Sequence, residues 1–315
     1  DGRGLAWSPD GRRLAVASED DSAHVWDVES GRKLGRLSHG KTVVGVAWGA
    51  GVIVSASRDG TARLWDPESL REIRSLAHPN PLLAVAVTAD GKQIATSDES
   101  EVVHIWSASS GREVTRRSNY GRADALAWSP DGQRLACGYG SVIRIWEVPS
   151  LKPRPDATLT HQYPVTTLDW SRDGQYLASG SNDRTARVWD AETGYELARL
   201  PHDDNLGGVS WDPDGRLLAT GGLDQRVRVW DAGTVEGRRL APGGTLEAVA
   251  ASADGRLIVS ASGDRSGRTV RVWDVESGRE LLHVKQRERV DAVALSFDTQ
   301  LLAAGTRDGH VLVMD

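Results

Sequence analysis

A tryptophan followed by a small or acidic residue recurs along the whole chain at nearly constant spacing. Successive pairs lie 39 to 43 residues apart, and Met314 with the Asp after it stands where an eighth pair would fall. The tryptophans are Trp26, Trp65, Trp106, Trp146, Trp189, Trp230 and Trp273. A self-similar period of about 40 residues indicates one supersecondary unit built many times. A residue found in most copies is therefore expected to serve the fold before it serves a site.

Each repeat carries the same succession of short runs and turns ahead of its tryptophan. An apolar run, such as 4–7 or 125–128, precedes a Ser-Pro-Asp-Gly turn, as at residues 8–11 and 129–132. Proline presets φ at the second turn position, and glycine accepts the positive φ that closes a hairpin. Further short runs come after the turn, as at 177–181, 186–190 and 196–200. Because no segment sustains a helical period, the pattern predicts an all-β meander of four strands per repeat.

The seven pairs and their turns, all in phase, resemble the WD-repeat β-propeller family over all 315 residues. The resemblance implies a single all-β propeller over residues 1–315, built of antiparallel blades. We expect blades at about 1–37, 43–76, 82–117, 123–160, 165–200, 206–240, 246–284 and 290–315. Eight first, second and third strands can be counted but only seven fourth strands. We therefore predict eight blades, the last lacking its outer strand, with a seven-bladed ring and one surplus repeat as the alternative.

The two ends of the sequence suggest that the ring was cut from a longer protein. The chain begins directly before its first inner strand and has no initiator methionine. At the other end, an unpaired third strand at 310–315 would be an exposed sheet edge. Another segment could add to the sheet there, so we expect possible edge-strand pairing through blade 8.

In the WD-repeat family, a histidine before the first strand, a second-strand hydroxyl, the turn aspartate and the tryptophan form a hydrogen-bonded chain. The resemblance implies three such sets: His39, Ser57, Asp59 and Trp65; His161, Ser181, Asp183 and Trp189; and His202, Thr220, Asp224 and Trp230. Which second-strand hydroxyl takes part stays open. Each member satisfies its neighbour, so the polar groups can be buried at low cost. A catalytic triad would need one copy to differ and to gain an oxyanion hole, so we predict structural roles.

A cation or a histidine stands two residues before every one of these tryptophans. Strand alternation places it on the same face as the tryptophan. We expect its stem to cross the next blade and its head to pair with a carboxylate there. The residues are His24, Arg63, His104, Arg144, Arg187, Arg228 and Arg271.

The composition of the chain argues against several classes of function. The net charge of −6 and the pI near 5.8 argue against a general nucleic-acid binder. The single cysteine, Cys137, excludes an internal disulfide and is expected to be a buried small hydrophobe in a reducing, cytoplasmic compartment. No apolar stretch is long enough for a membrane span, and no motif for a metal or cofactor is present. The 33 Arg against 5 Lys suggest a GC-rich, bacterial genome.

Sites are expected where the repeats differ. In this family, the loops before the first strands and the turns between second and third strands share a face that usually binds partners. Blade 4 departs most, and tyrosine and arginine are residues that anchor interfaces. The predicted partner-binding residues are Tyr120, Arg122, Tyr139, Tyr163 and Asn182, with Arg58, Arg289 and Arg307 at comparable positions. Loop drift without function is the alternative.

A second candidate site is the mouth of the central channel. Arg3, Asp124, Glu247 and Asp291 stand at equivalent places on their first strands. They could grip a basic side chain or a cation, or they could form a solvated set of ions that compensate one another.

We therefore predict a non-catalytic scaffold that binds another protein or a peptide through one face, with no nucleic-acid or membrane partner. One alternative is the sensing or regulatory part of a larger bacterial signalling protein, such as a kinase or an NTPase; that link is analogy. Another is an enzyme that uses the channel, for which only Asp124, Glu247 and Asp291 are on offer.

Overall fold

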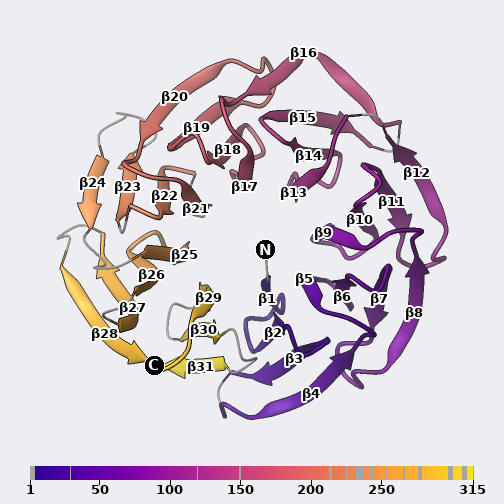
Figure 1. The fold of residues 1–315 in the computed structure, drawn as a ribbon, viewed down its shortest axis with the longest axis horizontal. Coiled ribbons are helices and arrows are strands. Elements are labelled where there is room, and N and C mark those ends of the chain that lie inside the picture. Colours follow the sequence, from indigo (N-terminus) through magenta and orange to yellow (C-terminus); the bar gives the residue numbers. More distant parts are fainter. Residues whose placement is uncertain are drawn as a thin grey trace.

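The computed structural model of the chain describes residues 4–28, 30–118, 120–148, 150–212, 215–224, 226–231, 237–240, 245–252, 254–264, 267–275, 279–296, 301–306 and 311–314. Of residues 152–158, 237–240, 245–246, 263–264, 267 and 291, only the backbone is described. The described residues form eight antiparallel sheets arranged as blades around one axis (Figure 1). The prediction of an eight-bladed, all-β propeller is confirmed, and the seven-bladed alternative is wrong.

The first four blades occupy the N-terminal half of the chain. Blade 1 is β1 (Leu5–Trp7), β2 (Arg13–Ala17), β3 (Ser22–Asp27) and β4 (Lys33–Ser38). Blade 2 is β5 (Val43–Gly49), β6 (Val52–Ser57), β7 (Thr61–Trp65) and β8 (Glu72–Ala77). Blade 3 is β9 (Leu82–Val87), β10 (Gln93–Asp98), β11 (Val103–Ser107) and β12 (Glu113–Arg117). Blade 4 is β13 (Ala123–Trp128), β14 (Arg134–Tyr139), β15 (Val142–Glu147) and β16 (Lys152–Thr160).

The other four blades complete the ring. Blade 5 is β17 (Val165–Trp170), β18 (Tyr176–Ser181), β19 (Thr185–Asp190) and β20 (Glu196–Pro201). Blade 6 is β21 (Leu206–Trp211), β22 (Leu217–Gly222), β23 (Val227–Asp231) and β24 (Gly237–Leu240). Blade 7 is β25 (Thr245–Ala251), β26 (Leu257–Asp264), β27 (Gly267–Asp274) and β28 (Glu280–Gln286). Blade 8 has three strands in the described residues: β29 (Val290–Leu295), β30 (Leu302–Thr306) and β31 (Val311–Met314).

The hydrophobic core is divided among the interfaces between neighbouring blades. Each of eight apolar clusters draws its members from two adjacent blades. The cluster that closes the ring joins Ala303 of blade 8 to Leu14 and Val16 of blade 1. Figure 1 shows β29 to β31 lying beside the sheet of blade 1. Because no blade buries its faces alone, the ring is stabilised by the stacking of neighbours.

The repeated tryptophan of each third strand packs toward the preceding blade. Trp65 of blade 2 belongs to the cluster shared with blade 1, and Trp106 of blade 3 belongs to the one shared with blade 2. Met314 takes the same place in blade 8, in the cluster shared with blade 7. A large side chain at this position therefore fills each interface.

The acidic residue after the tryptophan builds the next turn. The Oδ1 atom of Asp66 accepts the backbone N–H and the hydroxyl of Ser69, both at 2.7 Å. Asp190 accepts the same two bonds from Thr193, also at 2.7 Å. The carboxylate thus closes the turn between third and fourth strands, as short polar side chains do in turns.

The predicted polar chain is present in blades 2, 5 and 6. In blade 5, the Trp189 indole donates to the Ser179 hydroxyl at 2.8 Å, and Ser179 meets His161 Nε2 at 2.8 Å. His161 Nδ1 lies 2.8 Å from Asp183 Oδ2, which also accepts the backbone N–H of Gln162 at 3.0 Å. In this way the buried indole is connected to the loop that leads into β17.

Two of the predicted hydroxyls were wrong. Ser55 and Ser179 take part in place of Ser57 and Ser181, whereas Thr220 is confirmed. Ser181 lies two residues further along the same strand face, where its hydroxyl donates to the carbonyl of Tyr163 at 2.8 Å. The register explains the choice, because the hydroxyl that reaches the indole is the one paired with the residue two before the tryptophan.

The arginine two residues before the tryptophan does not reach the next blade as expected. Arg187 pairs with Asp183 and Glu196 of its own blade, both at 3.0 Å. Arg63 pairs in the same way with Asp59 at 3.7 Å and Glu72 at 3.0 Å. These carboxylates lie closer because the turn and the outer strand flank the arginine within one sheet.

We predict that Ser179→Ala destabilises the protein more than Ser181→Ala. Removal of the Ser179 hydroxyl leaves the Trp189 indole N–H and a buried His161 nitrogen without partners, at a cost of about 3 kcal/mol. Removal of the Ser181 hydroxyl loses turn bonds worth about 1 kcal/mol. Urea unfolding of both variants measures the difference, and equal losses would contradict the assignment.

We also predict that stability falls as the pH drops from about 6.5 toward 4. Burial, together with the neighbouring His104, lowers the pKa of His78 to about 4, whereas the unfolded chain keeps a value near 6.5. Burial also lowers the pKa of His39, His161 and His202. Between the folded and unfolded pKa values of these histidines the unfolded chain binds more protons to them, so their contribution to the free energy of unfolding is full above pH 6.5 and declines below it.

The His78 contribution can be measured separately. It amounts to about 2 kcal/mol between pH 7 and pH 5. His78→Gln, which cannot be protonated in this range, should show a shallower decline than the wild type in urea unfolding at each pH. Parallel curves would show that His78 does not titrate with folding.

Candidate partner-binding face

The loops before the inner strands and the turns between second and third strands meet on one face of the ring. The backbone N–H of Asn182, in such a turn, donates to the carbonyl of Pro164 before β17 at 2.9 Å. The N–H of Leu223 donates in the same way to Asn205 before β21 at 2.7 Å. These bonds hold the two kinds of loop together, so side chains on them are displayed from a fixed backbone.

Three large apolar side chains are exposed on this face, on three consecutive blades. Tyr120 of blade 4 is 39% exposed, Tyr163 of blade 5 is 61% exposed, and Leu223 of blade 6 is 40% exposed. We call these three residues the apolar arc. The other exposed large apolar side chains of the described residues lie on or beside outer strands: Leu34, Ile73, Val114, Tyr195, Leu197 and Leu281.

Sequence reasoning found two members of the apolar arc and missed Leu223. Leu223 directly precedes the turn residue Asp224, the position that Arg58 and Asn182 occupy before their own turn aspartates. This position belongs to the turns between second and third strands, which the family resemblance predicts to lie on the binding face. A leucine there, among polar counterparts, was the signal that would have found it.

The predicted polar residues of the face are present but differently engaged. Arg58 is exposed and Asn182 is half-buried. Arg122 pairs with Asp124 at 2.7 Å, and Arg289 pairs with Glu247 of the neighbouring blade 7. Arg307 lies outside the described residues.

Tyr139 does not belong to the exposed face as predicted. It ends β14 and is only 5% exposed, because its ring is covered by Tyr120 at a centroid distance of 5.9 Å. Its hydroxyl is buried and makes no hydrogen bond with the described residues, although Cys137 and Trp146 lie near it. Tyr139 therefore supports Tyr120 from below and offers no surface to a partner.

Blade 4 replaces the polar chain by a stack of aromatic rings. Cys137 pairs with Arg144 in the register and so occupies the hydroxyl position of the other blades. Tyr120 stands where the histidine would be and meets Trp146 edge to face at 4.9 Å. The Trp146 indole N–H is buried and has no hydrogen-bond partner among the described residues. Burial raises the pKa of the Cys137 thiol to about 12, so it stays protonated and unreactive.

The carboxylates predicted at the channel mouth are neutralised where their side chains are described. Asp124 pairs with Arg122, and Glu247 pairs with Arg289. Arg3 lies outside the described residues, as does the side chain of Asp291. For Asp124 and Glu247, the arrangement is the self-compensating set of ions that was the alternative to a ligand site.

A further acidic residue on an inner strand was not singled out from the sequence. Asp169 of β17 accepts the backbone N–H of Trp211 in blade 6 at 2.8 Å. Burial raises the pKa of Asp169 to about 7, against the effect of the N–H bonds from Trp211 and Trp170. Its carboxyl group ties two inner strands together, and we assign it a structural role.

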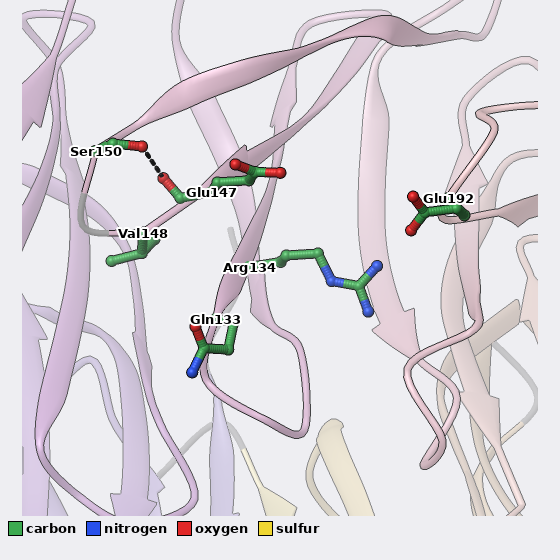
Figure 2. Close-up of a pocket in the computed structure, with 6 residues that line it drawn as sticks. All are labelled: Gln133, Arg134, Glu147, Val148, Ser150 and Glu192. Atoms are coloured by element: carbon green, nitrogen blue, oxygen red, sulfur yellow. Dashed lines mark hydrogen bonds between the residues drawn. The ribbon is translucent and has the colours of Figure 1, made fainter.

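Two grooves lie on the opposite face of the ring. One, of about 330 Å³, lies between blades 4 and 5 and is lined by Arg134, Glu147 and Glu192 (Figure 2). Arg134 starts β14, whose other end is Tyr139, so this groove and Tyr139 are on opposite faces. The Arg134 guanidinium is already used, since it stacks on Trp170 at 4.8 Å and donates to the carbonyl of Gly174 at 2.7 Å. The second groove, of about 720 Å³, lies between blades 1 and 2.

The described residues hold no group of three or more His, Cys, Asp or Glu side chains placed to bind a metal ion. In the same part of the chain, no helix has the length and apolar character needed to cross a membrane.

We predict that Cys137→Ser stabilises the protein by about 1 kcal/mol. A hydroxyl at this position accepts the indole N–H in other blades, as Ser179 does, and would satisfy Trp146. Sulfur is a poor acceptor by comparison. Thermal unfolding at pH 7 measures the gain, with Cys137→Ala as the matched control that removes the thiol without adding an acceptor. Equal stability of the Ser and Ala variants would show that the unpaired Trp146 N–H does not destabilise the wild type.

Two family models match the chain. The model for the WD domain, G-beta repeat, matches residues 120–147, 154–190, 194–231, 240–274 and 279–315. The model for the WD40 domain of anaphase-promoting complex subunit 4 matches residues 2–51.

Curated relatives match parts of the chain. A poly(A)+ RNA export protein of Schizosaccharomyces pombe is 42% identical over 81 residues, which are 25% of this chain and 23% of that protein. SEC12-like protein 1 of Arabidopsis thaliana is 30% identical over 208 residues, 65% of this chain and 42% of that protein. The small ribosomal subunit protein RACK1y of Oryza sativa is 30% identical over 112 residues, 34% of this chain and 33% of that protein. The chain thus spans less than half the length of each of these relatives.

Among solved structures, the computationally designed Ika8 protein superposes with a TM-score of 0.85 and 23% sequence identity, over 99% of this chain and 95% of that one. This likeness shows the fold alone. The G-beta repeat model covers more than half of the chain, and the periodic tryptophans, the polar chains and the eight blades agree with it. The chain belongs to the WD40-repeat family.

Proposed function

We propose that this propeller is a non-catalytic scaffold that binds another protein or a peptide through the face of blades 4 to 6. The observation that carries the proposal is the apolar arc of Tyr120, Tyr163 and Leu223 on consecutive blades. Exposed apolar groups that gather on one face are typical of interaction sites, and tyrosine is among the residues that dominate binding energy.

The support beneath the arc favours binding. The carbonyl of Tyr163 accepts the Ser181 hydroxyl at 2.8 Å, and the Leu223 N–H is bonded to Asn205. A surface whose backbone is already fixed loses little conformational entropy when a partner binds. Around the arc we propose Arg58, Arg122, Asn182 and Arg289 as a polar rim. Arg307, outside the described residues, remains part of the same prediction.

Two of the similar proteins are named as parts of assemblies, since one model describes an anaphase-promoting complex subunit and one relative is a small ribosomal subunit protein. Those names support a role in protein assembly for this chain as well. The named relatives come from a yeast and from plants, so a bacterial origin, and a place in a bacterial kinase or NTPase, receive no support from them. We retain the cytoplasm as the proposed location and protein, rather than nucleic acid or membrane, as the proposed partner.

A second mode of contact is proposed at blade 8. Within the described residues, β31 pairs only with β30, so one edge of β31 is open. A strand from this protein or from another chain could add there through backbone hydrogen bonds. The solution mass of the protein tests this mode, because pairing between copies through β31 gives a dimer or a larger species, and a monomer at all concentrations would contradict such pairing.

The channel enzyme is not the function we favour. Asp124 and Glu247 are each engaged by an arginine. Asp169 is engaged by a backbone N–H on the next blade. A general acid and base would need to converge on one substrate position.

We predict that alanine at Tyr163 or Leu223 weakens partner binding by about tenfold or more, as expected for the centre of an interface. The probes are 12-residue peptides selected on the wild-type protein by phage display and resynthesised with a fluorophore, and fluorescence anisotropy gives their Kd values.

The matched controls are Ile73→Ala and Leu281→Ala, which remove similarly exposed side chains from the outer strands β8 and β28. Peptides that lose affinity for the outer-strand variants, and not for the variants of the arc, would move the binding surface to the circumference of the ring and refute the proposal.

A further inference from the structure

One arginine of the repeated set lacks the carboxylates that its counterparts have. In blades 2, 5 and 6 the arginine two residues before the tryptophan pairs with the turn aspartate of its own blade: Arg63 with Asp59, Arg187 with Asp183, and Arg228 with Asp224. In blades 2 and 5 it also pairs with the first residue of the outer strand, Glu72 or Glu196. Each of these guanidinium groups is therefore neutralised within the protein.

Arg144 occupies the same register position in blade 4, opposite Cys137. The turn of this blade is Gly140 and Ser141, with no aspartate, and the residue opposite Trp146 on the outer strand is Pro153 in place of a glutamate. Among the residues whose side chains the structure describes, no carboxylate forms an ion pair with Arg144, whose guanidinium contacts the Tyr120 ring. Both of its usual partners have been lost by substitution, while the arginine has been kept.

The guanidinium of Arg144 rests on an aromatic ring at the surface. It lies 4.9 Å from the centre of the Tyr120 ring, and the residue is half-buried. A cation–π contact compensates part of the lost hydration. It supplies no acceptor for the N–H donors of the guanidinium, which are therefore left to solvent or to a ligand.

The platform under this cation is rigid. Tyr120 is fixed edge to face against Trp146 at 4.9 Å, and Trp146 is 1% exposed. Tyr120 keeps 39% of its surface exposed, so a ligand can contact the ring and the guanidinium together. Asp124, an exposed carboxylate near the start of β13, is already held by Arg122 at 2.7 Å.

We propose that Arg144, held on Tyr120, is the anion-binding point of the partner face. An acidic group of the partner peptide, a carboxylate or a phosphate, takes the place that the turn aspartate fills in blades 2, 5 and 6. The planar guanidinium can form two parallel bonds with either group, which a lysine cannot. The partner is thus expected to carry an acidic residue next to an apolar one that packs on Tyr120. This inference rests on the proposed function and names the chemistry of its ligand.

The test uses the display-selected 12-residue peptides and asks for coupling between Arg144 and one acidic position. The selected sequences should share an aspartate or glutamate beside an apolar residue. Replacing that acid by its amide should weaken binding to the wild type by about tenfold, and Arg144→Gln should weaken binding of the original peptide to the same degree. The two changes together should cost little more than either alone, as expected for a direct pair.

Controls separate this contact from charge and folding effects. Arg12→Gln removes one exposed positive charge on the opposite face and should leave the Kd unchanged. Arg144→Lys keeps the positive charge but not the planar guanidinium that forms two parallel bonds. Its Kd should fall between those of the wild type and Arg144→Gln. Thermal unfolding checks that each variant is folded at the assay temperature. Peptides with phosphoserine at the acidic position distinguish the sources: tighter binding assigns a phosphate, and weaker binding assigns a carboxylate.

The outcomes also separate the two proposals. Peptides that depend on Tyr163 and Leu223, but show no acidic preference and bind Arg144→Gln as they bind the wild type, would overturn the anion-binding point and leave the proposed function standing. Peptides insensitive to all three positions, or the absence of any selected peptide, would overturn both.

Discussion

The bond from a third-strand indole N–H to a second-strand hydroxyl is the interaction on which the order of blades 2, 3, 5, 6 and 7 depends. In blade 5 the Trp189 ring fills the interface with blade 4, while its N–H is held by Ser179 at 2.8 Å. A tryptophan can fill such an interface without penalty only if its N–H finds a partner. The Ser179 hydroxyl accepts this N–H and is itself hydrogen-bonded to Nε2 of His161, whose Nδ1 is hydrogen-bonded to Asp183. One buried ring thereby fixes the loops at the surface, and the binding face inherits its rigidity from the core.

Blade 4 shows the effect of losing this hydrogen-bonded chain. Cys137 stands at the hydroxyl position and Tyr120 at the histidine position, so the Trp146 N–H has no partner among the described residues and the rings are held by packing instead. The loss of the turn aspartate also releases Arg144 from its internal ion pair. Local rules are most often broken where a protein has a function to serve. Blade 4, in which the Trp146 N–H and the Tyr139 hydroxyl are buried without a hydrogen-bond partner among the described residues, also presents a tyrosine and a cation at the surface.

The sequence was enough to predict the architecture because its signals are periodic. Tryptophans and turns in phase set the number of blades, and Met314 was recognised in the eighth place. Periodicity could not choose between Ser179 and Ser181, because residues two apart share one face of a strand and only the ladder register decides which one meets the indole. The ladder register places the indole and the hydroxyl ten residues apart in blades 2, 3, 5 and 6.

Other features depended on distances that a sequence does not contain. Strand alternation predicted the correct face for Arg187, but it could not predict whether Asp183 or a carboxylate of the next blade lay closer to the guanidinium. Tyr139 was predicted on the exposed face, and only the packing of Tyr120 above it shows that it is buried. The pKa of Asp169 is raised because its carboxyl group is buried between two inner strands, and this burial follows from the packing of the blades.

The charge of the whole molecule and the charge of the binding face act on a partner in different ways. The net charge of −6 repels an acidic partner at long range, so electrostatic steering will not speed the encounter. At short range, Asp59, Asp183 and Asp224 are each compensated by an arginine of their own blade, whereas no carboxylate among the described side chains compensates Arg144. An acidic partner would therefore gain its affinity from slow dissociation after the fork of Arg144 is engaged. Selectivity would then come from the match between one anion and one apolar side chain, not from attraction between opposite net charges.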